Sequence, residues 1–141
     1  MWRIVLDTDV IIAAMRSPSG ASAALLRATD QRQIQILVSV AMALEYEAKC
    51  TMPEHFRAAG ISRLDAVNFV DAILFLAEPI SQRFVWRPQL RDPDDEMVLE
   101  TAINGQASAI VTFNLRDFGQ APYRFGIEVL QPGQMMRRLR E

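Results

Sequence analysis

The sequence has very few of the side chains that bind soft metals or form cross-links. Of its 141 residues, one is a cysteine, Cys50, and one is a histidine, His55. A single cysteine excludes an intrachain disulfide and a cysteine-based zinc site, and it is typical of proteins in a reducing cytoplasm. We expect no catalytic role for His55, which stands between Glu54 and Phe56. A metal site in this chain is therefore expected to use oxygen ligands.

Long apolar runs and an excess of charge are also missing. No run approaches the roughly 20 residues that a membrane span needs, and the first residues lack the basic, apolar and small-residue regions of a signal peptide. We therefore expect a soluble, cytoplasmic protein with no membrane contact. The formal net charge of −2 gives no overall attraction to nucleic acid, so binding to a polyanion would depend on local patches. Of the 15 basic residues only Lys49 is a lysine, and arginine is the better side chain for bidentate phosphate contacts.

What is present is an ordinary globular composition with an alternating pattern of elements. A hydrophobic content of 50% and a charged content of 23% predict one globular domain over residues 1–141. Strands are predicted at 4–6, 35–38, 109–112 and 126–130, with a weaker one at 83–86. Helices are predicted at 19–30, from 40, at 53–59, 62–76 and 94–104, and from 132 onward. The alternation of strand and helix predicts an α/β fold with a parallel sheet.

Polar residues follow the first two strands where the strands would end at one edge of the sheet. The apolar run 4–6 suits a strand buried on both faces, and it stops at Asp7, with Asp9 two residues later. Ser39 follows the second strand as a good helix cap. Glu45 lies less than two helical turns beyond Ser39, so it can still overlook that edge. Open α/β sheets bind their ligands at this edge.

Two further polar clusters are predicted at the same edge. The first, Asp92, Asp94, Asp95 and Glu96, surrounds the start of a helix, and the second, Asn114 and Asp117, follows the strand at 109–112. Carboxylates gathered without lysines between them raise each other's pKa values unless a cation neutralises them. Oxygen ligands favour Mg²⁺ or Mn²⁺ over zinc. Such an ion can activate water and stabilise charge on a phosphoryl group, so the residues indicate metal-dependent phosphodiester chemistry.

Three stretches of the sequence are similar to the motifs of one known family. They are VLDTDVIIAAMRSPSGASAALL, LVSVAMALEYEAK and RDPDDEMVLETAINGQASAIVTFNLRDF. On these stretches, which span nearly the whole chain, the protein resembles the PIN-domain ribonucleases, specifically the VapC-like toxins of bacterial toxin–antitoxin pairs. The resemblance implies a three-layer α/β/α sandwich with a central parallel sheet, Mg²⁺ or Mn²⁺ at its edge and endoribonuclease activity. It also implies an RNA substrate and a cognate antitoxin protein, and the apolar helices favour a homodimer.

The resemblance assigns roles to individual residues by matched position. The catalytic and metal-coordinating acids are Asp7, Glu45, Asp95 and Asp117, with Asn114 as a further ligand. The residues that support these acids through hydrogen bonds are Thr8 and Ser39. Independently of the resemblance, three arginines follow elements that lead to the same edge and are candidates for RNA phosphate contacts: Arg16, Arg91 and Arg116.

At two positions the chain departs from the family's pattern. Asp9 stands where the family most often has asparagine, and Asn114 stands where many relatives have aspartate. The first departure adds a negative charge close to Asp7. The second replaces a carboxylate by an amide, which is a weaker ligand for Mg²⁺.

Two other functions fit parts of the sequence. A phosphohydrolase of the haloacid dehalogenase type would use Asp7 as its nucleophile, with Ser39 and Lys49 following in the required order. Nothing in that class explains the residues at 112–117. The other alternative is a non-catalytic PIN-like module that binds RNA or protein without cutting it, for which the amide of Asn114 is the motive.

The acids also have plainer structural explanations. Asp7 alone would suit a turn at the end of a strand, and Glu45 alone a solvated helix position. Asp92 is expected in a turn around Pro93, and Asp94 as the N-cap of the helix that follows. Acids in the first turn of a helix also complement its dipole.

Overall fold

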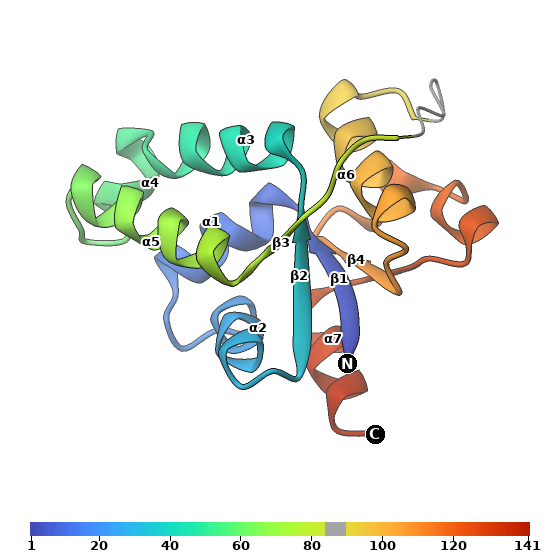
Figure 1. Ribbon diagram of the computed structural model, residues 1–141. Helices are drawn as coiled ribbons and strands as arrows, with labels where there is room; N and C mark the ends of the chain where they lie inside the picture. Colours follow the sequence, from blue (N-terminus) through green and yellow to red (C-terminus); the bar gives the residue numbers. More distant parts are fainter. Residues whose placement is uncertain (84–89) are drawn as a thin grey trace.

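The computed structural model describes residues 1–83 and 90–141, which form a five-stranded parallel sheet between layers of helices (Figure 1). The strands are β1 (Trp2–Leu6), β2 (Ile34–Val38), β3 (Glu78–Pro79), β4 (Ala109–Val111) and β5 (Glu128–Leu130). The α-helices are α1 (Thr8–Arg16), α2 (Ala21–Asp30), α3 (Val40–Cys50), α4 (Pro53–Ala58), α5 (Arg63–Leu76), α6 (Pro93–Asn104) and α7 (Pro132–Leu139). Two short 3₁₀ helices, η1 (Leu115–Phe118) and η2 (Pro122–Phe125), lie between β4 and β5. The three-layer α/β/α architecture expected from the sequence is confirmed.

The order of the strands places a crevice beside the end of β1. The sheet runs β3-β2-β1-β4-β5, so the chain proceeds in one direction from β1 to β3 and in the other direction from β1 to β5. β1 and β4 pair in parallel with Ile4 opposite Ala109 and Leu6 opposite Val111. Ligands of such sheets bind where the strand order reverses, outside the carboxyl ends of the two strands. The residues that follow Leu6 and Val111 are therefore brought side by side at that point.

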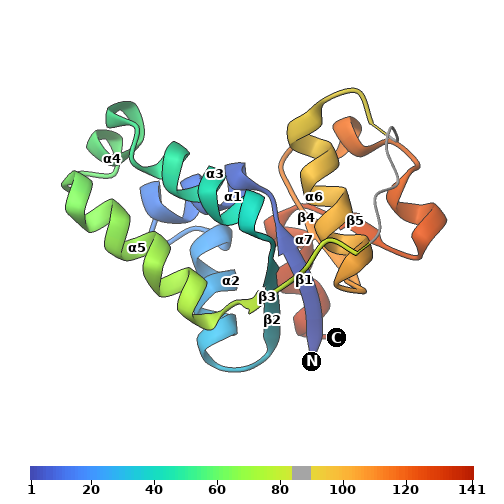
Figure 2. The same cartoon turned by 45° about the horizontal axis from the view of Figure 1, so that its top comes forward.

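Different helices cover the two faces of the sheet. α6 packs on one face against β1, β4 and β2, while α1, α2, α3 and α5 lie on the other side (Figures 1 and 2). α7 packs against α2. The carboxyl-terminal part of the central strand is fully enclosed, since Ile4, Val5 and Leu6 have no exposed surface. None of the described helices is long and apolar enough to cross a membrane.

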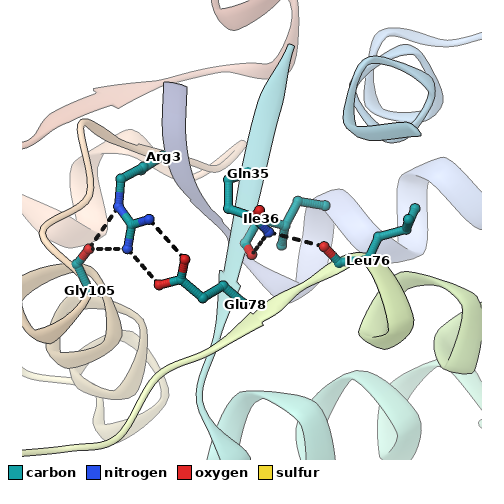
Figure 3. Close-up of polar contacts among 6 residues, drawn as sticks. All are labelled: Arg3, Gln35, Ile36, Leu76, Glu78 and Gly105. Carbon is teal, nitrogen blue, oxygen red and sulfur yellow. Dashed lines mark hydrogen bonds and ion pairs between the residues drawn. The ribbon is translucent and has the colours of Figure 1, made fainter. Parts of the chain in front are cut away.

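An arginine ties three distant parts of the fold together on the α6 side (Figure 3). Arg3 of β1 donates two hydrogen bonds to the carboxylate of Glu78 in β3, at 2.9 and 2.7 Å, and so reaches past β2. Its guanidinium also donates to the carbonyl oxygen of Gly105 at the end of α6, at 3.2 and 2.9 Å. The side chain of Gln35 in β2 donates to the carbonyl of Leu76, at the end of α5. These contacts hold the edge strand and the ends of two helices against the sheet.

The first helix is an element that the sequence analysis did not predict. Asp7 has an extended backbone and its side chain accepts a hydrogen bond from the backbone N–H of Thr8, so α1 begins directly after β1. β-Branched residues such as Val10 and Ile11 have a low intrinsic preference for helix. In the fold these two side chains are fully buried. Packing of the apolar face, together with the cap, outweighs that preference.

The region between α5 and α6 also differs from the prediction. Glu78 and Pro79, which follow the helix predicted at 62–76 and were not predicted as a strand, form the edge strand β3, which pairs with Leu37 and Val38 of β2. An edge position tolerates proline, because its missing N–H faces away from the ladder. The strand predicted at 83–86 falls largely outside the residues that the structure describes.

The predicted helix caps have mixed outcomes. The N-cap predicted at Ser39 is confirmed. The helix predicted at 62–76 begins with a capping box of Ser62 and Asp65. The N-cap predicted at Asp94 is wrong, because Asp92 holds that position and its Oδ1 accepts a hydrogen bond from the N–H of Asp94 at 2.9 Å. Pro93 then occupies the first helical position, where it needs no hydrogen-bond partner.

Candidate metal centre

Asp7 lies at the end of the central strand, between two hydroxyl-bearing residues. Its Oδ1 accepts a hydrogen bond from the N–H of Thr8 at 2.8 Å, and its Oδ2 accepts one from the hydroxyl of Thr112 at 2.8 Å. Burial and then the nearby charge of Asp9 raise the pKa of Asp7, to about 6, against the lowering effect of both hydrogen bonds. A carboxylate held in this way is costly to ionise unless a cation is close.

Asp9 faces the loop that follows β4. Its Oδ2 accepts hydrogen bonds from the N–H of Phe113 at 3.0 Å and from the side-chain amide of Asn114 at 3.1 Å. The hydroxyl of Thr112 lies at 3.4 Å from the same oxygen. The other oxygen, Oδ1, is buried and has no hydrogen-bond partner among the residues described. Burial is also the main reason why the pKa of Asp9 is raised.

Glu45 reaches the same place from α3. The hydroxyl of Thr8 donates a hydrogen bond to its Oε2 at 2.9 Å, which links the glutamate to the residue that follows Asp7. Its pKa is raised by burial first and then by the charges of Asp94 and Asp7. Thr8 thus supports two acids, because its N–H donates a hydrogen bond to Asp7 and its hydroxyl donates one to Glu45.

Asp95 and Asp117 complete the gathering of acids from the other side of the sheet edge. Asp95 lies in the first turn of α6 and Asp117 in η1, and both line a cavity of about 430 Å³. Burial, followed by the charges of Asp7 and Asp117, raises the pKa of Asp95 to about 7. The charge of Asp117 also raises the pKa values of Asp7 and Asp9. These five residues, Asp7, Asp9, Glu45, Asp95 and Asp117, are called the acidic cluster below.

Two of the three predicted arginines lie beside this cluster. Arg91 and Arg116 line the cavity that contains Asp95 and Asp117. Arg16 does not, because it is the last residue of α1, whereas the cluster lies at the first turn of that helix. There its Nη1 lies 3.5 Å from the ring Nδ1 of His55.

Ser39 supports the site less directly than expected. Its hydroxyl caps α3 by accepting from the N–H of Met42 at 3.3 Å, and it accepts a second bond from Thr101 of α6 at 2.9 Å. In the described part of the chain it makes no hydrogen bond to an acid of the cluster. Through Thr101 it joins the start of α3 to α6, the two helices that carry Glu45 and Asp95.

The donor set of the acidic cluster fits a hard divalent cation. All its side-chain donors are carboxylate oxygens, the ligands that Mg²⁺ and Mn²⁺ prefer. No lysine or arginine in residues 1–83 and 90–141 forms an ion pair with any of the five acids. One oxygen, Oδ1 of Asp9, is buried without a partner. These partly buried carboxylates are thus gathered without a directly paired cation.

The carboxylates are not arranged as a finished ligand shell. Among the residues described, no group of three histidine, cysteine, aspartate or glutamate side chains is close enough to hold a metal ion. Carboxylates without a cation repel one another, so ion binding requires these side chains to draw together.

Two contributors to the site were missed by reasoning from the sequence. Thr112 was treated only as a strand residue, yet its hydroxyl bonds to Asp7 and it follows Val111, the β4 residue that pairs with Leu6. The parallel pairing of the two strands is the signal that could have found it. Arg124 of η2 lines the same cavity as Arg91 and Arg116, and nothing in its local sequence marks it.

Comparisons with known proteins agree with this geometry. A family profile described as "PIN domain" matches residues 3–116. Among solved structures, the chain is similar to one described as the crystal structure of VapBC2 from Rickettsia felis bound to a DNA fragment from their promoter. The TM-score is 0.65 at 15% sequence identity, over 91% of this chain and 98% of that one. At this identity the likeness concerns the fold alone. No curated protein sequence matches the chain.

Proposed function

The chain belongs to the PIN-domain family, and on that premise we propose that it is an endoribonuclease that uses Mg²⁺ or Mn²⁺ at the acidic cluster. PIN domains are generally nucleases, which supports a hydrolase. The observation that carries the proposal is the concentration of partly buried carboxylates at the edge of the sheet. Burial and mutual repulsion raise the pKa of Asp7 to about 6 and that of Asp95 to about 7, and no cation of the described chain pairs with either.

The residues of the cluster have separate tasks in this proposal. Asp7, Glu45, Asp95 and Asp117 would hold the ion. A bound Mg²⁺ or Mn²⁺ supplies a polarising charge and a water molecule of lowered pKa. Thr8 and Thr112 fix the orientation of the carboxylates of Glu45 and Asp7 through the hydrogen bonds described above. Restricting these side chains in advance lowers the cost of assembling the site.

The cavity beside the cluster suits an RNA backbone. Arg91, Arg116 and Arg124 line it, and arginine forms bidentate contacts with phosphate oxygens. Asp95 and Asp117 line the same cavity, so a phosphodiester held by the arginines would lie beside the acids. Contacts of this kind position the nucleic acid without reading its bases, and they compensate locally for a net charge of −2.

We extend the proposal to the partner of the protein. The similarity to a VapBC2 complex supports a toxin with a cognate antitoxin, which would block the acidic cluster by charge complementarity, for example with an arginine. Protein contact is also supported by apolar side chains left on the surface of α3 and α5. Val40 is 76% exposed, Leu44 63%, Leu64 66% and Phe75 88%. Exposed apolar side chains on two helices that pack together are available for contact with a second copy, and we include a homodimer in the proposal.

Cleavage of RNA by purified protein tests the proposal. Structured and unstructured RNAs are incubated with the wild-type protein in Mn²⁺ and in EDTA. We expect cleavage that depends on the ion. In Asp7→Asn and in Asp95→Asn the cleavage rate should fall by about 100-fold or more, because each substitution replaces a carboxylate by an amide of nearly the same shape. Asp71→Asn, on the exposed side of α5, is the matched control and should cleave like the wild type.

Two results would contradict the proposal. Cleavage that survives both Asp7→Asn and Asp95→Asn would place the reaction elsewhere. If the wild type binds RNA but does not cut it in Mn²⁺, a binding module is favoured instead. The haloacid dehalogenase alternative is disfavoured, because the PIN-domain match covers residues 112–116, part of the segment which that alternative leaves unexplained.

A further inference from the structure

A second cavity lies among the helices on the α1 and α2 side of the sheet. It has a volume of about 240 Å³, and its walls come from the end of α1, the start of α2, the loop after β4 and the start of α7. It is separate from the cavity that contains Asp95 and Asp117, and none of the described residues that line it is acidic. It is called the α2–α7 cavity below.

Two connections place this cavity beside the acidic cluster. Asp9 and Ala13 are four residues apart on α1, so they lie on one face of the helix, about 6 Å apart along its axis. Ala13 lines the cavity. Phe113 lines it as well, and the backbone N–H of Phe113 donates a hydrogen bond to Oδ2 of Asp9 at 3.0 Å. The α2–α7 cavity therefore begins about one helical turn from an acid of the cluster.

Phe113 gives the cavity an aromatic wall. This large apolar side chain is 46% exposed. An aromatic ring that is partly open to solvent is a platform on which a base of single-stranded RNA can stack. Sites for drug-sized ligands have volumes of roughly 300–1,000 Å³. At about 240 Å³, the α2–α7 cavity suits a smaller planar group such as one nucleobase.

Polar groups line the same space. Ser22 is only 4% exposed, and its hydroxyl makes no hydrogen bond within the described part of the chain. Ser17 and Gln131 add a second hydroxyl and an amide to the lining. A buried hydroxyl without a partner is unfavourable, so a ligand that bonds to Ser22 is favoured there. The edge of a nucleobase has both donors and acceptors, and hydroxyl and amide groups pair with either.

Two exposed arginines lie at the edge of the cavity. Nη1 of Arg27 donates a hydrogen bond to the carbonyl of Pro18 at 3.0 Å, in the loop between Ser17 and α2. Nη1 of Arg137 lies 4.0 Å from the position that a Cβ atom on Gly133 would occupy, and Gly133 lines the cavity. Arginines at such positions can bind the phosphates of a nucleotide whose base is held inside.

We propose that the α2–α7 cavity binds one unpaired nucleotide of a single-stranded RNA, with its base stacked on Phe113 and bonded to Ser22. This inference rests on the proposed function, because it takes the RNA to continue from the arginine-lined cavity past the acids. Phe113 and Arg116 line the two cavities and are three residues apart in one loop, so at most about 11 Å of backbone separates them. A short strand can therefore reach both cavities. A base held in a cavity has left its helix, so single strands are preferred over duplexes.

Binding of short single-stranded RNA, measured by fluorescence anisotropy in EDTA to prevent cleavage, tests the inference. Phe113→Ala should bind at least about fivefold more weakly than the wild type, because stacking is lost, whereas Phe113→Trp should retain affinity. Ser22→Ala should bind about two- to tenfold more weakly, because one hydrogen bond is lost. Tyr123→Ala is the matched control, because Tyr123 is 51% exposed and lines neither of the two cavities.

A matched abasic RNA separates a base site from general attraction to the backbone. This probe has the same sugars and phosphates and no bases. The wild type should bind normal RNA at least about fivefold more tightly than abasic RNA, and Phe113→Ala should lose most of this difference. A duplex of the same sequence should bind the wild type more weakly than the single strand.

The outcomes separate this inference from the proposed function. Wild-type RNA affinity in Phe113→Ala, or an equal loss in Tyr123→Ala, would overturn the base site while cleavage of RNA stands. Equal losses in Phe113→Ala for normal and abasic RNA would overturn it as well, because the contact would not involve a base. A wild type that binds RNA as expected and does not cut it in Mn²⁺ would remove the nuclease and support the base site.

Discussion

At the scale of single residues, one hydroxyl group organises the carboxylates nearest the central strand. Thr112 is fully buried and donates to Oδ2 of Asp7, while its oxygen accepts from the N–H of Asn114 at 3.0 Å. It thereby fixes both an acid and the loop that contacts Asp9. Second-layer contacts of this kind commonly change metal affinity by about 10- to 100-fold when they are removed.

The substitution Thr112→Val tests this role, because it keeps the shape of the side chain and removes the hydroxyl. We expect Mn²⁺ affinity to fall about tenfold. The pKa of Asp7 should rise further above its present value of about 6, since the Thr112 hydrogen bond lowers it. Calorimetry measures the first effect and NMR titration of the carboxyl group the second.

Thr29→Val is the matched control for this experiment. Thr29 is also buried, but its hydroxyl donates to the carbonyl of Leu25 in its own helix, away from the acids. Unchanged Mn²⁺ affinity and an unchanged Asp7 pKa in Thr112→Val would show that the hydroxyl does not organise the site.

At the scale of elements, Arg3 connects the central strand to two parts of the fold that are distant in sequence. It binds the carboxylate of Glu78 in β3 and the buried carbonyl of Gly105 after α6. The hydrogen bonds from Arg3 also lower the pKa of Glu78. β3 has only two residues and so forms few backbone hydrogen bonds with β2. Side-chain contacts are therefore an important part of what holds it to the sheet.

Arg3→Met should therefore destabilise the protein by about 1–2 kcal/mol in urea unfolding. Part of the loss is the ion pair and part is the buried carbonyl left without its donor. Arg138→Met is the control, because Arg138 forms an equally short pair with Glu128, at 2.7 Å and similar exposure. The control should cost no more than about 1 kcal/mol. Equal losses in the two variants would show that the contact with Gly105 contributes nothing.

The elements also show why local sequence was insufficient in two places. β-Branched residues after Asp7 disfavour helix, yet α1 forms because its apolar face is buried and its first N–H is capped. Glu78 and Pro79 have no strand pattern, and they become a strand because β2 lies beside them. In both cases the deciding partner is distant in sequence. Helices with their own caps and periodic faces, such as α5, were predicted correctly.

At the scale of the whole molecule, the acidic cluster reduces the stability of the metal-free protein near neutral pH. Asp7 has a pKa of about 6 in the folded protein and an ordinary pKa of about 3.9 when unfolded. The folded state therefore binds more protons between these values, and stability falls as the pH rises through them. Asp65 and Glu78 have lowered pKa values, so their contribution is already complete at about pH 5.

Thermal unfolding in EDTA between pH 5 and pH 8 should show this loss. The contribution of Asp7 is on the order of 2 kcal/mol after allowance for its partial exposure, which corresponds to several degrees in unfolding temperature. Asp7→Asn should flatten the profile, and Mn²⁺ should stabilise the wild type increasingly as the pH rises, because ion binding displaces protons. A metal-free wild type whose unfolding temperature does not change over this range would contradict the prediction.

The sequence by itself determined the fold class and the family, and it brought forward the acids proposed for the site. Buried strands, capped helices and carboxylates at strand ends are local features, and they follow from hydrophobic periodicity and backbone capping. Asp7, Glu45, Asp95 and Asp117 could be named as a set only through the family resemblance, which assigns their roles by matched position, and the structure places them near one another.

Only the tertiary structure decided how these acids are held and which side chains accompany them. The contacts of Thr112 with Asp7 and of Asn114 with Asp9 join residues more than 100 positions apart. Arg16 and Arg91 had the same standing in the sequence, and the fold puts only Arg91 in the cavity beside the acids. Such contacts depend on the pairing of β1 with β4 and on the depth at which each group is buried. Neither the strand pairing nor the depth of burial can be read from the residues that flank a given side chain in the sequence.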